Sequence, residues 1–237
     1  MPELLVSVRN VGEARIAKEA GADWIDVKEP LRGPMGRPDK DVARRILAAC
    51  ESRFTSCAMG ELLTLGAEIL ESWPSFHFKK FGLSGWGQNE SVTMQKLQYV
   101  REKEKARGVP VLYADHEQCQ ALPVLLGIKK VVETGFTALV VDTWGKKSGW
   151  LGQFLDFRVM RKIQDYCQKH GLRWGLAGSL NESRIHILLG QGIQPDWFGL
   201  RGGVCFKSSR LGRISERKIR AIKEVLVSGS PVAAIEN

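Results

Sequence analysis

The sequence predicts an α/β protein that closes into a single (β/α)8 barrel, the architecture also called a TIM barrel. Short apolar runs alternate with longer amphipathic segments from one end of the chain to the other, which is the pattern of parallel strands joined by helices. The apolar runs number eight, which favours closure of the sheet into a barrel. The chain has 237 residues, close to the roughly 250 that are typical of this fold.

Each predicted strand is a short run of four or five residues. Such a run suits a strand that is buried on both faces, as in a parallel sheet covered by helices. In chain order, the predicted strands cover residues 4–8, 24–27, 55–58, 77–81, 109–113, 138–142, 174–177 and 197–200.

The segments between the strands carry start and stop signals of helices. Asn10 and Glu13 form a predicted capping box, and Asp39 is expected to cap the second helix. Gly171 is placed to end the sixth helix, and Ser215 to begin the last one. Because no break in composition marks a second domain, we expect residues 1–237 to form one (β/α)8-barrel catalytic domain.

The charge and the cysteines limit the class of protein. The net charge of +9 could indicate nucleic-acid binding, but the basic residues are spread along the chain without interleaved aromatics. A cationic enzyme for anionic metabolites explains this charge equally well. The five cysteines are widely spaced without a C-x-x-C pair, which argues against a disulfide framework or a zinc ribbon and favours a reducing cytoplasm.

Two further patterns are missing from the sequence. The N-terminal MPELLVSVRN does not have the pattern of a signal peptide, and no run of 18 apolar residues occurs. We therefore expect a cytoplasmic protein without a membrane partner. The four histidines lack metal-ligand spacing, so no metal site is predicted. The sequence leaves the formation of a homo-oligomer open.

A charged pair ends the second predicted strand, in the stretch WIDVKEP. Side chains alternate along a strand, so Asp26 and Lys28 share one face and point into the barrel. Pro30 ends the strand, which places Lys28 near the C-terminal end, where barrel enzymes have their active sites. A lysine with a nearby carboxylate suits imine chemistry, although a buried ion pair that only fills the barrel is the alternative.

The fourth predicted strand brings a second lysine. In FKKFG one of two adjacent lysines must face inward, and Gly82 places Lys80 near the strand exit. Taken alone, a lysine that extends to solvent is the simpler interpretation. A second candidate lysine at the same end of the barrel favours a role for Lys80 in the active site.

The sixth predicted strand ends in an acid, Asp142, and Lys146 lies in the loop after it. An acid in that place is frequent in barrel active sites, and a helix cap is the alternative for Asp142. Glu61 and Asp115 follow the third and fifth strands, so they are candidates by position only.

Two glycine turns follow the seventh and eighth strands, where barrels often bind a phosphate through backbone N–H groups. The predicted phosphate-binding residues are Gly178, Ser179, Arg201, Gly202 and Gly203. A side chain from Arg201 or Arg210 could add a charged clamp. Tight turns without a functional role are the alternative.

Together these stretches resemble one family, the (5-formylfuran-3-yl)methyl phosphate synthases, also called 4-(hydroxymethyl)-2-furancarboxaldehyde-phosphate synthases. The matching stretches are LLVSVRNVGEA, GADWIDVKEP, KFGLSG, YAD, VDTWGKK, LAGSL and FGLRGGVC followed by GRI. They occur in the family order and cover nearly the whole chain, and DVKEP is the most specific of them.

The resemblance implies a (β/α)8-barrel lyase that condenses two molecules of glyceraldehyde 3-phosphate to a furan aldehyde phosphate for methanofuran-type one-carbon coenzymes. It implies no cofactor and no metal. By the same resemblance Lys28 forms the Schiff base and Lys80 accepts a proton, while Asp26, Asp142 and Lys146 match further active-site positions.

The sequence departs from the family pattern at three places. Pro34 stands where a small polar residue is expected, Glu61 stands where Asp is expected, and the segment 206–210 is less rich in glycine than expected. An altered substrate or a dependence on a partner therefore stays open. The alternative functions are another lysine-dependent aldolase or isomerase for a sugar phosphate and, from a different class, a barrel that binds nucleic acid.

Overall fold

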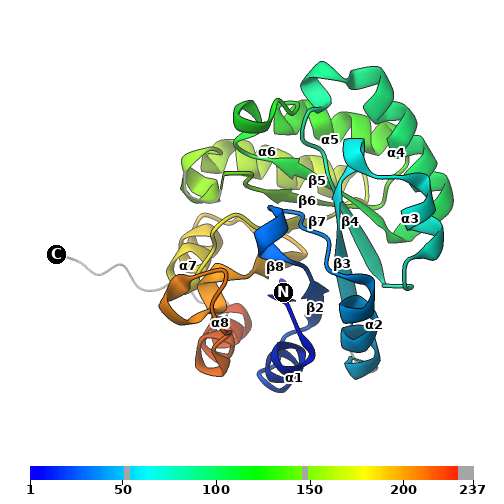
Figure 1. Cartoon of the computed structure of the whole chain (residues 1–237). Helices are drawn as coiled ribbons and strands as arrows, with labels where there is room; N and C mark the ends of the chain where they lie inside the picture. Colours follow the sequence, from blue (N-terminus) through cyan, green and yellow to red (C-terminus); the bar gives the residue numbers. More distant parts are fainter. Residues whose placement is uncertain (51–53, 146–148, 229–237) are drawn as a thin grey trace.

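The computed structural model describes residues 1–50, 54–145 and 149–228. In these parts of the chain, eight parallel strands form a closed barrel in the order β1 to β8, and eight α-helices surround it (Figure 1). The strands are Glu3–Val8 (β1), Trp24–Val27 (β2), Phe54–Glu61 (β3), Phe78–Gly82 (β4), Gly108–Tyr113 (β5), Ala138–Asp142 (β6), Arg173–Leu176 (β7) and Trp197–Leu200 (β8). The predicted fold class is confirmed.

The helices lie outside the strands and alternate with them along the chain. They are Val11–Glu19 (α1), Lys40–Ala49 (α2), Ala67–Ser72 (α3), Glu90–Glu104 (α4), Val124–Glu133 (α5), Phe157–Lys169 (α6), Glu182–Gly190 (α7) and Glu216–Ser228 (α8). β1 pairs with β8, and α1 lies beside α8 (Figure 1). The two ends of the described chain thus close the ring. Within the described ranges, we find no helix whose length and hydropathy would let it cross a bilayer.

The predicted strands agree closely with the observed ones. β2, β6 and β8 have the predicted bounds, β1 and β5 begin one residue earlier, and β4 and β7 are shifted by one residue. The exception is β3, which continues to Glu61, three residues beyond its predicted end at Ala58. A bulge in the pairing of β3 with β4 carries this extension.

The helix caps confirm most of the expected signals. The Asn10 side chain accepts a hydrogen bond from the Glu13 N–H at 2.9 Å, but the Glu13 carboxylate accepts from the Arg9 N–H and not from Asn10, so only half of the predicted capping box forms. Gly171 follows α6 with φ 61°. Ser215 precedes α8 and accepts from the Lys218 N–H. The predicted cap at Asp39 is wrong: its side chain makes no capping bond and instead pairs with Arg32 at 2.7 Å.

Aromatic side chains close the N-terminal end of the barrel. The Trp24 ring stacks between Phe54 and Phe78 with centroid distances of 4.9 and 4.7 Å, and Trp197 lies 5.7 Å from Phe78. The Arg173 guanidinium lies 5.1 Å from the centroid of Trp197. All five residues begin a strand, so they fill the barrel at that end and leave its C-terminal end for a binding site.

The two adjacent lysines of β4 lie on opposite faces of the sheet. Lys79 points outward to α4, where it pairs with Glu104 at 2.7 Å, and both side chains are only 3% exposed. Lys80 therefore points into the barrel.

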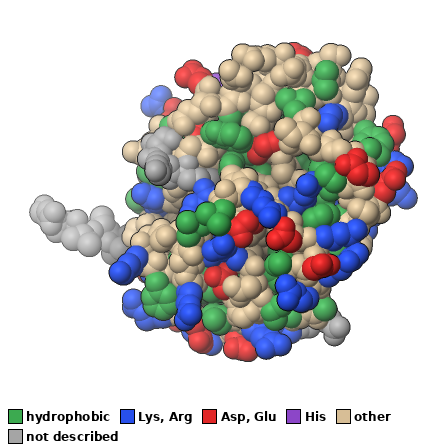
Figure 2. Space-filling view, viewed as in Figure 1, with side chains coloured by type: hydrophobic (Ala, Val, Ile, Leu, Met, Phe, Trp, Pro, Cys, Tyr) green, Lys and Arg blue, Asp and Glu red, His purple; other side chains and the backbone are tan. Residues whose placement is uncertain are grey.

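Charged side chains of both signs are mixed on the surface. On the face shown in Figure 2, Lys and Arg side chains are interspersed with Asp and Glu side chains.

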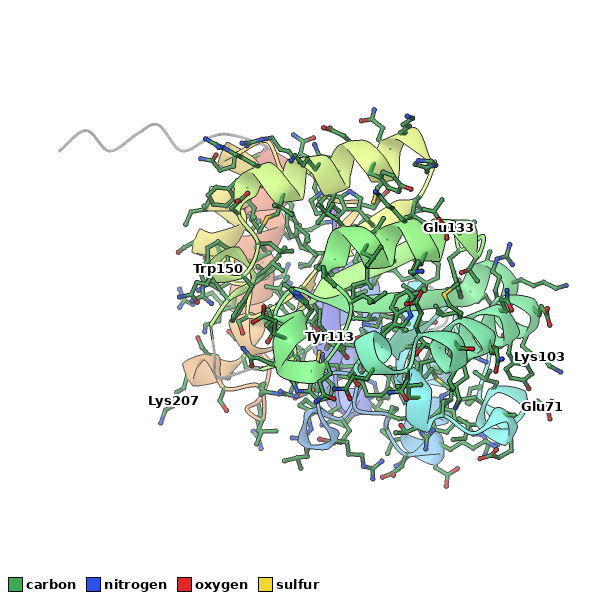
Figure 3. The ribbon with its side chains drawn as sticks, turned by 90° about the horizontal axis from the view of Figure 1, so that it is seen from above. Glu71, Lys103, Tyr113, Glu133, Trp150 and Lys207 are labelled. Carbon is green, nitrogen blue, oxygen red and sulfur yellow. The ribbon has the colours of Figure 1, made fainter. Side chains whose placement is uncertain are left out.

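The Lys79–Glu104 pair yields a stability prediction. Glu104→Gln leaves a buried ammonium without its carboxylate, which is expected to lower the free energy of unfolding by about 3–5 kcal/mol. Urea denaturation measures the change. The control is Glu71→Gln, which removes the ion pair between Glu71 and Lys103. These two side chains are 62% and 48% exposed and lie at the edge of the molecule (Figure 3). That variant is expected to change stability by about 0–1 kcal/mol, and equal effects of the two variants would contradict the prediction.

Candidate active site

A cavity of about 220 Å³ opens at the C-terminal end of the barrel. Eight of the ten residues predicted for the site line it: Lys28, Lys80, Asp142, Gly178, Ser179, Arg201, Gly202 and Gly203. Asp26 lies in the barrel interior and pairs with Lys80. Lys146 lies outside the described residues. The fold thus brings together side chains from β2, β4 and β6 and the turns after β7 and β8.

Asp26 is a fully buried carboxylate inside the barrel. Its oxygens accept hydrogen bonds from the hydroxyls of Ser7 at 2.8 Å and Ser56 at 2.7 Å, and the Lys80 Nζ lies 2.9 Å away. The three donors belong to β1, β3 and β4, and Ser7 and Ser56 are the register partners of Asp26 on the strands beside it. Sequence reasoning missed both serines, although a hydroxyl side chain within a mostly apolar strand is a signal.

The lysines decide the protonation state of Asp26. Burial alone would raise the pKa of this carboxyl group, but the positive charges of Lys80 and Lys28 and the hydrogen bond from Ser56 hold it below its ordinary value. Asp26 is therefore a carboxylate at neutral pH. One buried negative charge then faces two lysine side chains at the cavity.

The two predicted phosphate turns are packed against each other. Gly178 has φ 108° and Ser179 has φ 54°, so this turn needs a left-handed backbone. A Cβ atom at Gly203 would lie 2.1 Å from the carbonyl oxygen of Leu180. Only glycine at position 203 lets the turn after β8 approach the turn after β7 this closely.

The turn after β8 leads into a single 3-10 turn, η7 (Gly202–Val204). The first N–H groups of such a turn have no acceptor within it. Within the described parts of the chain, we find no protein acceptor for the N–H groups of Gly202 and Gly203. Both residues line the cavity, so these groups are available to a ligand anion there.

The side chain of Arg201 has a different role from the expected clamp. Its five N–H donors are directed at the Glu13 carboxylate and at carbonyl oxygens in the chain, with Glu13 at 2.6 and 3.1 Å. The carbonyl acceptors are Ser7, Arg210 and Gly212. The guanidinium group thus ties α1 to the loop after β8, and its N–H groups are already used.

Two other arginines, Arg184 and Arg210, line the cavity together with the turns after β7 and β8. Arg184, at the start of α7, donates to the Ser179 carbonyl oxygen and lies 5.5 Å from the Trp150 ring centroid. Arg210 donates to the carbonyl oxygens of Pro30 and Gly33 at 2.6 and 2.9 Å, and burial lowers its pKa from the ordinary value. Arg184 could not be placed there from sequence, because its position on the helix depends on the Ser179 turn.

Asp142 and Asp115 arrange the loop after β6. Asp142 accepts from the N–H of Thr143 at 2.7 Å. It does not cap a helix, since the next α-helix, α6, is capped by Asp156. Asp115 accepts from the N–H groups of Trp144 and Gly145 at 2.6 and 2.7 Å. This carboxylate therefore holds the segment that leads to residue 146.

A family model described as 4-HFC-P synthase matches residues 4–223 of the chain. The (5-formylfuran-3-yl)methyl phosphate synthase of Methanothermobacter thermautotrophicus is 30% identical over 239 residues, covering 95% of this chain and 99% of that protein. The protein of the same name from Methanococcus maripaludis strain C5 is also 30% identical, with coverages of 94% and 98%.

Solved structures of low identity share the fold. The phosphoribosyl anthranilate isomerase of Thermotoga maritima has a TM-score of 0.69 at 14% identity and covers 96% of this chain and all of its own. The 3-keto-L-gulonate-6-phosphate decarboxylase of Vibrio cholerae has a TM-score of 0.61 at 12% identity, with coverages of 97% and 99%. These likenesses show a shared barrel.

The ionised state of Asp26 yields a prediction for acid stability. A carboxyl whose pKa is lower in the folded than in the unfolded state stabilises the fold above the unfolded value of 3.8 and loses this contribution as the pH falls through the folded value. The wild type should therefore lose its stability advantage over Asp26→Asn as the pH drops from about 4. Urea denaturation of both proteins at several pH values measures this difference, and parallel pH profiles would contradict it.

The contact at Gly203 yields a prediction for anion binding. Gly203→Ala should push the two turns apart, weaken the binding of inorganic phosphate by about tenfold or more, and cost about 1–3 kcal/mol of stability. Calorimetric titration with phosphate measures the affinity. The control is Gly190→Ala, because a Cβ atom there meets no atom within 4 Å. A folded Gly203→Ala variant that binds phosphate as the wild type does would place the anion elsewhere.

Proposed function

The chain belongs to the 4-HFC-P synthase family, and on this premise we propose that it condenses two molecules of glyceraldehyde 3-phosphate to (5-formylfuran-3-yl)methyl phosphate through a lysine Schiff base. The observation that carries the proposal is the arrangement of Lys28 and Lys80 around the buried Asp26, in a cavity whose other end offers backbone N–H groups to a phosphate. We further propose that the enzyme is cytoplasmic and acts in the synthesis of methanofuran-type coenzymes.

The overall reaction sets what the site must do. Two triose phosphates reach the composition of the furan phosphate by losing one phosphate and two molecules of water, without net oxidation or reduction. The protein must therefore supply a carbon nucleophile and a series of proton transfers. A lysine imine serves the first need, because loss of a neighbouring proton converts it to an enamine, which attacks a second carbonyl carbon.

The geometry favours Lys28 as the residue that forms the imine. Lys28 follows directly on β2 and lines the cavity, so a short strand and the buried network around Asp26 fix its backbone. Its amine attacks the substrate carbonyl carbon to give a carbinolamine, and departure of the hydroxyl as water leaves the imine.

Lys80 fits the role of proton carrier for these steps. In the ion pair with Asp26 it holds a proton, which it can give to the hydroxyl that leaves the carbinolamine. The neutral amine that results can then accept the proton from the carbon next to the imine, and it returns to the ammonium form. Asp26 stabilises the ammonium form of Lys80 before and after these two proton transfers. We assign Asp142 and Lys146 to the condensation step that follows.

The phosphate end explains how the substrate is oriented. The N–H groups of Gly202 and Gly203, with Arg184 and Arg210 beside them, would hold one phosphate on the β7–β8 side of the cavity. The carbonyl carbon would then point to the lysines on β2 and β4. Binding through a remote phosphate positions a small substrate that has few other groups to recognise.

The Schiff base yields the prediction that tests this function. Borohydride added with glyceraldehyde 3-phosphate should reduce the imine to a stable adduct, and peptide mapping should place it on Lys28. Lys28→Arg should fold, lose the adduct and lose furan formation, because a guanidinium stays protonated and does not form an imine. Lys103→Arg, at an exposed lysine, is the control and should keep both.

Three outcomes separate the parts of the proposal. An adduct on Lys80 would show that Lys80 and not Lys28 forms the imine, while the Schiff-base mechanism would stand. Furan formation without any lysine adduct would end the mechanism. A pure protein that forms no furan from glyceraldehyde 3-phosphate, as read by its ultraviolet absorbance and mass, would overturn the function.

A further inference from the structure

A second carboxylate, Glu61, lies at the C-terminal end of the barrel on the side away from the phosphate turns. It accepts hydrogen bonds from the Tyr113 hydroxyl at 2.7 Å, the Ser84 hydroxyl at 2.8 Å and the Ser84 N–H at 3.1 Å. These partners come from β5 and from the segment after β4. The mechanism above gives this group no task, although the charge of Asp142, a residue that lines the cavity, acts on it.

A β-bulge places Glu61 there. Ala58 pairs with Lys80 and Glu61 pairs with Gly82, so β3 uses one residue more than β4 over this stretch. Gly60, inside the bulge, has φ 96°. Ala58 belongs to the apolar cluster inside the barrel and Met59 to the cluster outside it. Without the extra residue, position 60 would face inward and Glu61 outward, so the bulge turns the carboxylate into the barrel.

Gly82 makes the space that Glu61 and Tyr113 share. A Cβ atom at Gly82 would lie 2.2 Å from a Glu61 carboxylate oxygen and 2.3 Å from the Tyr113 hydroxyl. Gly82 follows Lys80 by two residues on β4, so both positions share one face. The Glu61–Tyr113 pair therefore lies directly beyond Lys80 toward the open end of the barrel, and Figure 3 shows Tyr113 in the middle of the molecule.

The surroundings of Glu61 favour its neutral form. Burial raises its pKa above the ordinary range, against the hydrogen bonds from Tyr113 and Ser84, and the negative charge of Asp142 on β6 acts in the same direction as burial. Burial and the nearby carboxylates also raise the pKa of Tyr113 well above its usual value. Cys119 also lies near the pair, and burial raises the pKa of its thiol to about 12.

We propose that Glu61, in its hydrogen-bonded pair with Tyr113, is the general acid that protonates a hydroxyl oxygen leaving as water during furan formation. This proposal rests on the function proposed above. In the step, the carbon–oxygen bond breaks and the oxygen takes the Glu61 proton. The neutral amine of Lys80 accepts the proton of the adjacent carbon and becomes an ammonium, and the electron pair of that C–H bond forms the new double bond. Glu61 ends the step as a carboxylate and regains a proton from solvent.

The position of Glu61 suits a water-forming step better than the first imine. The phosphate turns and Lys28 lie on the β7, β8 and β2 side, whereas Glu61, Tyr113 and Asp142 come from β3, β5 and β6. Lys80, on β4 between β3 and β5, belongs to the second side, and its amine reaches Asp26 of β2. A substrate held at the phosphate end would grow by condensation toward Glu61, so the hydroxyl groups of the joined product would reach this carboxyl.

The test compares Glu61→Gln with the wild type on glyceraldehyde 3-phosphate. Glutamine keeps the size and the acceptor for Tyr113 but cannot donate a proton as an acid. Turnover should fall by about 10²–10⁴-fold, the usual contribution of general acid catalysis, with KM changed by less than about threefold. Intermediates that have not yet lost one or two water molecules should accumulate, and mass spectrometry should detect them as species heavier than the furan phosphate by those waters. Borohydride should still trap the imine on Lys28.

The pH profile and two control variants complete the test. Wild-type kcat should fall as the pH rises through the raised pKa of Glu61, because only the protonated form donates, and the residual activity of Glu61→Gln should lack that fall. Glu61→Asp keeps an acid and should recover part of the turnover, while Glu71→Gln, on the surface, should match the wild type.

The outcomes separate this inference from the function on which it rests. If the wild type forms furan and Glu61→Gln does so at a similar rate, the general-acid role is wrong while the function stands. If Glu61→Gln loses imine trapping together with turnover, Glu61 has only a structural role and the inference is also overturned. If the wild type forms no furan at all, the function and the inference fall together.

Discussion

The site depends on the ion pair and the hydrogen bonds of the buried Asp26 carboxylate. An ionised group inside a barrel costs several kcal/mol in lost hydration unless hydrogen bonds and charges replace the water. Here Ser7, Ser56 and Lys80 do so, one from each of three strands. Since Ser7 and Ser56 are register partners of Asp26, a shift of one residue in β1 or β3 would turn a hydroxyl outward. The ion network and the strand register therefore stabilise one another.

Side chains alternate between the two faces of a strand, and this alternation explains how charged residues occur in strands that are buried on both faces. On β4, Lys79 pairs with Glu104 of α4 and Lys80 pairs with Asp26, so each lysine of the doublet has its own buried carboxylate. The outer pair opposes rotation of the strand that would exchange the two side chains. The orientation of Lys80 toward the cavity is thus fixed from outside the barrel as well as from inside.

The strands and the inward lysines could be predicted because they depend on local pattern: apolar runs give the strands, and alternation gives the faces. Glu61 was a candidate by position only, since the bulge depends on pairing with β4; Gly60 is its one sequence signal, because a glycine inside a strand often marks a bulge. The expected clamp at Arg201 differed because Glu13, 188 residues away in sequence, accepts two of its hydrogen bonds. Contacts between distant residues thus decide what a charged side chain does, and they are what local patterns lack.

The barrel itself does not determine the chemistry. Structures such as the phosphoribosyl anthranilate isomerase of Thermotoga maritima share the fold at 14% identity, and a fold of this kind supports many reactions. On the proposed function, the backbone turns after β7 and β8 would hold the phosphate of a small substrate through N–H groups. Lys28 and Lys80 around one carboxylate would supply amine chemistry to the carbonyl group that the bound phosphate positions. The distance between these two parts of the cavity would then select the substrate by its length.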